Sequence, residues 1–367
     1  MKRTSLRRVA APGVAVMALS LALTACGAGN ETGTTDGDST LSGTLNGAGA
    51  SSQEAAMGAF RSGFQSANSG VTVNYDPVGS GGGREQFIGG GVAFAGTDAY
   101  LSEEEGEIEG ARERCGGDPI EIPNYVSPIA VIFNVEGVDE LQLSGETVAG
   151  IFANEITRWD DPAIAETNPD VDLPDAAITA VHRADDSGTT DNFTAYLDAV
   201  APDVWTYGEV GEWPINAGEA APQTSGVVSA VTNGTNTIGY ADASQAGDLG
   251  IARIGVGDDF VEPSAEAASR VLEVSPRVEG QGENSMAFDL DRDTDESGAY
   301  PIVLTSYLLA CPTYDDQATA DLVKGFLTYV ISDEGQQAAA DAAGSAPLSD
   351  ALQEEAQGLV DQISAAS

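Results

Sequence analysis

From residue 41 onward, short apolar runs alternate with glycine-rich turns and amphipathic segments. Alternating apolar and polar residues over 71–75 predict a strand with one buried face, and the apolar spacing over 56–67 predicts a helix. The nearly continuous apolar run 127–135 is typical of a strand buried on both faces of a parallel sheet. Further strands are expected over 41–45, 92–95, 177–181 and 237–241, and helices over 84–88, 145–153, 190–200 and from 316 onward. This order of strand, small-residue turn and helix predicts an α/β fold.

The first 26 residues have the features of a secretion signal. Four basic residues come before any acidic one, an apolar run follows over 9–25, and the run ends in Leu-Thr-Ala-Cys at Cys26. Because this ending resembles the bacterial lipobox, we expect 1–25 to be a signal peptide and Cys26 to be lipidated; an ordinary signal peptide with an incidental cysteine is the alternative. Residues 26–40 contain no large apolar side chain and are expected to form a flexible tether. The protein is therefore expected outside the cytoplasm, lipid-anchored to the cell membrane.

The part of the chain after the signal is strongly acidic. It has 11 basic residues against 58 acidic ones, a net charge of about −47. Such a surface repels nucleic acid and anionic lipid headgroups, which makes both poor partners. An anionic ligand would have to be held by local donors, against the field of the whole protein.

Cysteine and histidine usage narrows the chemistry further. Apart from Cys26 the chain has Cys115 and Cys311, and an even pair in an oxidising compartment predicts a disulfide, with two buried free thiols as the alternative. His182 is the only histidine, and no P-loop motif is present. The clustered His and Asp ligands of a metal-dependent phosphatase are missing, so neither a metal nor a cofactor is expected.

Three loops share one design, in which a strand ends, small residues follow and a helix or turn begins. We call 49–52 loop one, 79–81 loop two and 187–189 loop three. Glycine allows a close approach of the backbone, and the N–H groups at a helix start point outward as donors with favourable dipoles. Each loop alone is better explained as a helix cap or a plain turn. The three together predict an oxyanion-binding site.

Charged residues beside these loops refine the prediction. Arg183 lies at the start of loop three and can offer two parallel donors to an oxyanion, with Asp185 placed to orient the guanidinium. Asp98 ends another predicted strand. A carboxylate repels an anion unless the ligand brings a proton to donate, which phosphate does and sulfate does not. Asp98 therefore predicts selection of phosphate over sulfate, with a simple turn or cap aspartate as the alternative.

Several of these runs resemble a known family, the bacterial phosphate ABC-transporter substrate-binding proteins. The similar runs, in order, are 47–52 (GAGASS), 79–82 (GSGG), 96–99 (GTDA), 156–162, 182–190 (HRADDSGTT), 238–240 and 300–302. The run 182–190 is the most specific of them. The resemblance covers nearly all of the chain after the tether.

The resemblance implies a two-lobed periplasmic-binding-protein fold of type II, with the ligand in the cleft between the lobes. Lobe one would combine 41–125 with 299–367, and lobe two would be 126–298. The implied phosphate donors are Ala50, Ser51, Ser52, Ser80, Arg183, Ser187, Gly188 and Thr189, with Asp98 as acceptor and Asp185 behind Arg183. Many relatives have a bulky apolar residue at the position of Ser52, which puts the role of that side chain in question. The implied partners are inorganic phosphate and the membrane subunits of an ABC importer, and the protein is expected to be a monomer.

Other functions remain open at the level of sequence. Another tetrahedral oxyanion such as sulfate or molybdate would suit the same loops, and Asp98 discriminates against that reading. A secreted serine hydrolase or phosphatase would use the serine-rich loops with His182, but this histidine lies beside Arg183 at a strand end and has no second histidine to support a triad. An acidic surface adhesin or immunogenic scaffold would not need three donor loops. We therefore expect a binding protein and no enzymatic activity.

Overall fold

The computed structural model describes residues 41–366. The predicted signal peptide (1–25), the lipidation site Cys26 and the tether (26–40) lie outside the described residues. Within 41–366, no helix combines the length and the apolar character needed to cross a membrane.

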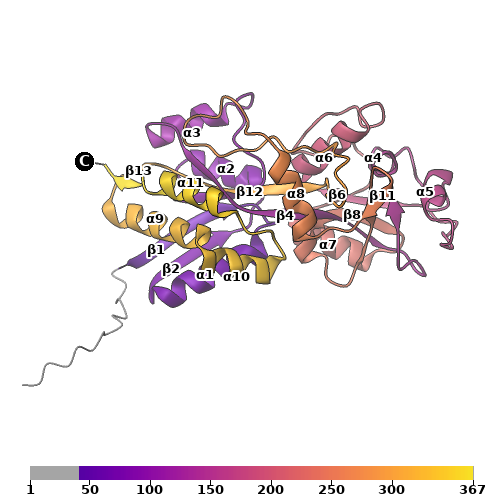
Figure 1. Ribbon diagram of the computed structural model, residues 1–367, viewed down its shortest axis with the longest axis horizontal. Coiled ribbons are helices and arrows are strands. Elements are labelled where there is room, and N and C mark those ends of the chain that lie inside the picture. The colour runs from indigo at the N-terminus through magenta and orange to yellow at the C-terminus, as the bar shows by residue number, and fades with distance from the viewer. Residues whose placement is uncertain (1–40, 367) are drawn as a thin grey trace, which may run out of the picture. The chain divides into compact units, whose positions relative to one another are not determined.

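The central sheet has two parts that share one long strand (Figure 1). The first half-sheet has the order β2-β1-β3-β12-β4, in which β1 is parallel to β2 and β3, and β12 is antiparallel to β3 and β4. Its strands are β1 (Ser42–Gly49), β2 (Gly70–Asp76), β3 (Phe94–Thr97), β4 (Ile120–Asn134) and β12 (Val303–Ala310). The helices that follow these strands or pack on them are α1 (Glu54–Ala67), α2 (Ser80–Ile88), α3 (Glu107–Cys115), α9 (Gln317–Ile331), α10 (Asp333–Ala343) and α11 (Asp350–Val360).

The second half-sheet continues from β4 in the order β4-β8-β6-β7, with β6 parallel to both β7 and β8. Its strands are β6 (Thr179–Arg183), β7 (Glu219–Ala221), β8 (Thr237–Asp242) and β9 (Gly250–Ile251), the last of which also pairs with β4. The helices of this part are α4 (Gly145–Phe152), α5 (Pro162–Thr167), α6 (Gly188–Val200), α7 (Gln223–Asn233) and α8 (Ala265–Val274). Small strands complete the fold: β5 (Gln142–Leu143), β10 (Arg253–Val256) and β11 (Asp259–Val261) in one sheet, and β13 (Thr313–Tyr314) with β14 (Ser364–Ala365) in another.

Strand β4 corrects one prediction from the sequence. As expected it is buried along nearly its whole length, but its neighbours are antiparallel to it and not parallel. It pairs with β12 over Ile120–Pro128 and with β8 over Ile129–Asn134. A continuous apolar run indicates that both faces of a strand are covered, and β4 is covered by α7, α8, α10 and α11 among others. Such a run does not indicate whether the neighbouring strands are parallel or antiparallel.

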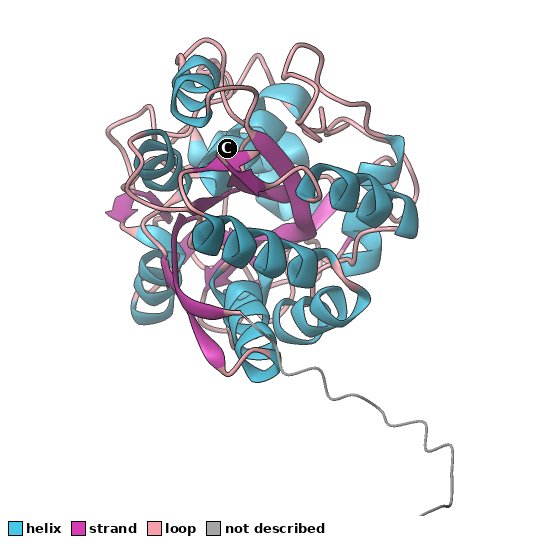
Figure 2. Cartoon of the chain, turned by 90° about the vertical axis from the view of Figure 1, so that its left-hand side faces the viewer, coloured by secondary structure: helices cyan, strands magenta, loops and turns pink. Residues whose placement is uncertain are grey.

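Segments from the two ends of the chain pack together on the first half-sheet. Helix α1 contacts α10, and α9 contacts β1, so the indigo and yellow elements lie together in Figure 1. The rings of Phe64 and Phe94 both contact Phe326, with centroid distances of 5.5 and 5.2 Å. Seen from this end of the molecule, helices surround the strands (Figure 2).

The second half-sheet has its own aromatic core. Phe193 of α6 stacks on Tyr240 of β8 with a centroid distance of 4.3 Å, and Phe152 of α4 contacts both rings edge-on. Trp213 stacks between Tyr240 and the imidazole of His182. This cluster anchors the end of β6, which carries Arg183, and the start of α6, which carries Gly188 and Thr189.

The predicted disulfide is confirmed. Cys115 ends α3 and Cys311 directly follows β12, and their Cα atoms are 5.1 Å apart in a bonded pair. The bond closes a loop of 196 residues and joins the early part of the first half-sheet to its late part.

Candidate functional site

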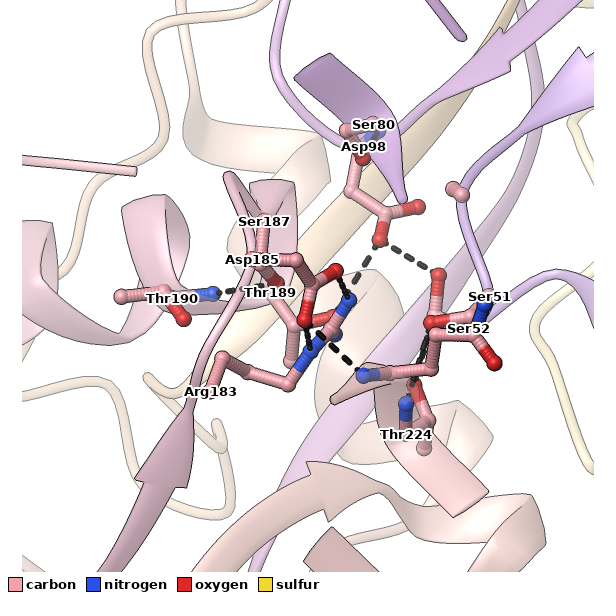
Figure 3. A network of polar contacts seen from close by, with 12 residues as sticks. Ser51, Ser52, Ser80, Asp98, Arg183, Asp185, Ser187, Thr189, Thr190 and Thr224 are labelled. Carbon is pink, nitrogen blue, oxygen red and sulfur yellow. Dashed lines mark hydrogen bonds and ion pairs between the residues drawn. The ribbon is translucent and has the colours of Figure 1, made fainter. Parts of the chain in front are cut away.

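The structure brings all three predicted loops together at one place (Figure 3). Loop one leads from β1 toward α1, loop two from β2 into α2, and loop three from β6 into α6. The predicted side chains that line this place are all buried: Ser51, Ser52, Ser80, Asp98, Arg183, Ser187 and Thr189 have relative exposures of 3% or less. We call loops one and two with Asp98 the aspartate side, and the end of β6, loop three and the start of α7 the arginine side.

The close contact between the two sides explains why residue 188 is a glycine. A Cβ atom at this position would lie 2.7 Å from the Ser80 hydroxyl and 2.8 Å from the Cβ of Asp98, closer than carbon side chains tolerate. Ser187 precedes it as the N-cap of α6 and accepts a hydrogen bond of 3.2 Å from the Thr190 backbone N–H. The helix therefore starts two residues earlier than predicted, with its N-terminus directed at the aspartate side.

Arg183 and Asp185 form the predicted pair. The Arg183 Nε donates to Asp185 Oδ1 at 2.9 Å, and a terminal nitrogen of the same guanidinium donates to Oδ2. The Asp185 Oδ1 atom also accepts from the backbone N–H of Gln223, at 2.9 Å. Because the Arg183 side chain is only 2% exposed, this double contact fixes the plane of a buried positive charge.

Asp98 accepts hydroxyl donors on both carboxylate oxygens. Ser52 and Thr189 donate to Oδ2, the latter at 3.3 Å, and Ser306 donates to Oδ1 at 2.7 Å. Burial raises the pKa of Asp98, against the opposing effect of these hydroxyl donors and of the Arg183 charge. The side chain of Ser52, whose role the sequence left in question, thus contacts the central carboxylate directly.

The backbone around Asp98 is held as firmly as its side chain. Its N–H donates to the Ser80 hydroxyl oxygen at 3.1 Å, and its carbonyl accepts from Asn192 Nδ2 at 2.7 Å. Ser80 was predicted as a donor to the ligand; here its oxygen accepts from Asp98, which leaves its hydroxyl hydrogen available to another acceptor.

Residues outside the predicted set also join the two sides. The hydroxyl of Ser51 lies 3.0 Å from that of Thr224 and accepts from the Thr224 backbone N–H at 3.1 Å. Gln245 donates to the carbonyls of Ser51 and Ser52 at 3.0 and 3.1 Å. Thr224 belongs to the first turn of α7, so a second helix N-terminus faces the site.

Sequence reasoning missed Thr224, Gln245, Asn192 and Ser306. Ser306 had the clearest signal, since it lies with Thr305 in an otherwise largely apolar strand, where a buried hydroxyl needs a partner. The other three lie in segments without a distinctive motif, and only their place in the fold reveals them.

The imidazole of His182 lies in a different environment from that of a catalytic base. It stacks on Trp213 at a centroid distance of 4.8 Å, and its Nδ1 is 2.9 Å from the Arg183 carbonyl oxygen. Burial lowers the pKa of this imidazole. The hydroxyls of Ser51 and Ser52 contact Thr224 and Asp98. This geometry gives no support to a serine–histidine pair.

An acidic groove of about 960 Å³ lies next to the site. Asp186, Asp191 and Glu209 line it together with Arg84, and the Arg84 guanidinium is paired with Glu107 at 2.7 Å and Asp186 at 3.5 Å. This groove therefore offers no unpaired cation to an anion, in contrast to the neutral donors of the three loops.

Comparison with known proteins identifies the family of the chain. The sequence profile of the PBP superfamily domain matches residues 34–334. The phosphate-binding protein PstS2 of Mycobacterium bovis is 34% identical over 374 residues, which cover 97% of this chain and all of that protein. The phosphate-binding protein PstS 3 of Mycobacterium tuberculosis is 35% identical over 339 residues, 88% of this chain and 90% of that protein.

A solved structure supports the fold. The periplasmic phosphate-binding protein PfluDING, determined with bound phosphate, matches with a TM-score of 0.71 at 22% identity, over 86% of this chain and 93% of that one. The sheet with two parts, the flanking helices and the near full-length sequence matches lead to one conclusion. The chain belongs to the PBP superfamily and, within it, to the family of the PstS phosphate-binding proteins.

Proposed function

We propose that this protein captures inorganic phosphate outside the cytoplasm and delivers it to an ABC importer. The observation that carries the proposal is a buried cluster in which neutral hydroxyls and helix N-termini surround one oriented guanidinium and one carboxylate. Such donors suit a tetrahedral oxyanion, and the PstS relatives are named for phosphate binding. The function is binding and release, without chemistry on the ligand.

The proposed ligand contacts follow from this cluster. Arg183 supplies the formal positive charge, and the other donors are Ser51, Ser52, Ser80, Ser187, Gly188 and Thr189. Ala50 was also predicted as a donor, but its backbone N–H donates to the Gly96 carbonyl at 2.9 Å. Ser52 and Thr189 now donate to Asp98 Oδ2. In the complex these two hydroxyls would turn to the anion, and the P–OH group of phosphate would donate to Oδ2 in their place. Sulfate has no proton at neutral pH and would leave two negative groups facing each other.

The proposed lobes are 41–125 with 299–367, and 126–298. The boundary at 125/126 lies inside β4, close to the point at which this strand exchanges β12 for β8 as its partner. The site lies between segments of both proposed lobes, since loops one and two belong to the first and loop three to the second. Opening of the lobes would separate Ser51 from Thr224 and admit the ligand.

The proposed location is the outer face of the cell membrane. The basic and apolar start of the chain, the cysteine at its end and the polar segment 26–40 support a lipid anchor on Cys26 with a flexible tether. We propose that the protein acts there as a monomer. Labelling of cells with a radioactive fatty acid should mark the wild-type protein and should fail to mark the Cys26→Ala variant.

Titration calorimetry with phosphate and sulfate tests the central proposal. Phosphate should bind with a clear heat signal at neutral pH, and sulfate should bind far more weakly. Sulfate binding that equals or exceeds phosphate binding would show that phosphate is not the preferred ligand. The absence of binding for both anions would reject an oxyanion-binding function.

A further inference from the structure

Ser306 lies on β12, between β3 and β4 in the first half-sheet, and its side chain is fully buried. In the ladder it pairs with Tyr125 of β4. Its hydroxyl donates to Asp98 Oδ1 at 2.7 Å. Neither the sequence motifs nor the proposed ligand contacts include this residue.

The two oxygens of the Asp98 carboxylate have different kinds of partner. Oδ2 accepts from Ser52 in loop one and from Thr189 at the start of α6, and both are themselves proposed ligand contacts. In the described part of the chain, the side-chain partner of Oδ1 is Ser306, which is part of the sheet. The Asp98 backbone is held by Ser80 and Asn192, so the carboxylate keeps its orientation when the hydroxyls on Oδ2 leave.

We propose that Ser306 is a specificity-determining positioning residue, which occupies Oδ1 of Asp98 and thereby presents Oδ2 of an ionised carboxylate to the P–OH group of phosphate. This inference rests on the proposed function, because it assigns the selectivity of that same site. Ser306 acts through Asp98 and does not contact the anion itself.

The contact with Ser306 favours the ionised form of the Asp98 carboxylate. An ionised carboxylate accepts the phosphate proton and repels sulfate, whereas a protonated one donates and accommodates sulfate as well. The charged or titratable groups that act on Asp98 or respond to its charge are Arg183 on β6, Tyr75 on β2, Tyr125 on β4 and Asp242 on β8. Burial raises the pKa of Asp98, and the Ser306 hydroxyl is among the donors that lower it. Its removal should therefore raise that pKa further.

The experiment compares the wild type with Ser306→Ala and with Ser127→Ala. Ser127 is a matched control, since it is a buried serine of β4 whose hydroxyl has no hydrogen bond to Asp98 within residues 41–366. Phosphate and sulfate affinities are measured by calorimetry at about pH 6 and about pH 8. A hydrogen bond to a charged group corresponds to about a 10-fold to 100-fold change in affinity. The phosphate-to-sulfate ratio of Ser306→Ala should fall by this factor, and that of Ser127→Ala should not.

The pH dependence separates this role from a merely structural one. At each pH the phosphate affinity of Ser306→Ala is divided by that of the wild type, so that the titration of phosphate itself cancels. The deficit should be larger at the lower pH, because a raised pKa leaves more of Asp98 protonated there. A uniform deficit at both pH values, with an unchanged phosphate-to-sulfate ratio, would assign Ser306 to stability alone and overturn the inference.

Two further outcomes keep the test decisive. If Ser306→Ala does not fold, Ser306→Cys replaces it, since a thiol has similar volume and is a weaker donor; a wild-type phosphate-to-sulfate ratio in that variant would overturn the inference. A wild-type protein that binds no phosphate would contradict the proposed function and not the role of Ser306 within it.

Discussion

The two sides of the candidate site are built from similar loops but carry opposite charges. The arginine side has a guanidinium held by Asp185 at the N-terminal end of α6, and both this guanidinium and the helix N-terminus attract an anion. The aspartate side has a carboxylate with a raised pKa among serine hydroxyls, and its charge repels one. We propose a division of tasks: the first side provides affinity, and the second provides discrimination by the protons of the ligand.

The supports of the two sides also differ. The aspartate side belongs to the half-sheet that carries the Cys115–Cys311 disulfide, while the arginine side rests on the aromatic cluster around Tyr240. Tyr240 connects that cluster to the site directly, because its hydroxyl accepts from the Arg183 backbone N–H at 3.2 Å and lies 2.7 Å from the Thr190 hydroxyl. A disulfide therefore stabilises the half-sheet of the aspartate side, and an aromatic cluster supports the arginine side.

Removal of the disulfide is expected to have the largest effect, and to affect stability rather than selectivity. In the chain-entropy model, a loop of 196 residues stabilises the fold by up to about 4–5 kcal/mol. Cys115→Ala combined with Cys311→Ala should lower the free energy of unfolding accordingly, as measured by denaturant titration. The phosphate-to-sulfate ratio should stay at its wild-type value. A changed ratio would show that the anchoring of the aspartate side also tunes its discrimination.

Arg183→Ala should abolish most of the affinity on the arginine side. Loss of one partner from a buried charge pair costs about 3–5 kcal/mol, which corresponds to a loss of affinity of about a hundredfold or more. Calorimetry with phosphate measures the loss. Arg158→Ala is the matched control, because Arg158 is about half exposed and pairs with Asp160 at the surface. A phosphate affinity within about threefold of wild type would remove Arg183 from the site.

Asp98→Asn tests the opposite side and should change selectivity more than affinity. The amide keeps the shape of the carboxylate but can also donate a hydrogen bond. Phosphate binding should survive, weakened by no more than the about 1.5–3 kcal/mol of a hydrogen bond to a charged group. Sulfate binding should strengthen relative to phosphate in the same titrations. An unchanged phosphate-to-sulfate ratio would show that Asp98 is not the selectivity element.

Thr224→Val should have the smallest effect, because it alters only the contact between the two sides. The variant keeps the shape of the side chain but removes the hydroxyl that lies 3.0 Å from that of Ser51. A neutral hydrogen bond contributes about 0.5–1.5 kcal/mol, so phosphate affinity should fall by about tenfold at most, with the phosphate-to-sulfate ratio unchanged. Thr232→Val, at an exposed position of the same helix, is the control. A larger loss of phosphate affinity in Thr224→Val than in Asp98→Asn would show that the contact between the two sides contributes more to phosphate affinity than the charge at Asp98.

The sequence by itself determined the local elements and most of the site's components. Apolar periodicity located β2 and α1 because side-chain spacing in helices and strands is a local property. The small-residue loops predicted the candidate oxyanion site, and the run 182–190 predicted the Arg183–Asp185 pair, because those two residues lie two positions apart along the chain. The disulfide joins cysteines 196 positions apart, and it was predicted from the even number of cysteines and the expected oxidising compartment.

The tertiary structure alone decided which strands pair and which residues distant in sequence come into contact. The direction of β4 depends on its partners β12 and β8, which its own hydrophobicity does not specify. Ser306 and Asp98 are 208 positions apart, and Ser51 and Thr224 are 173 apart, so no local pattern could pair them. These contacts exist because the antiparallel β4–β12 ladder and the start of α7 meet the loops at one point. The acceptor carboxylate can be read from the sequence, but the serine that orients it becomes visible only when the sheet is assembled.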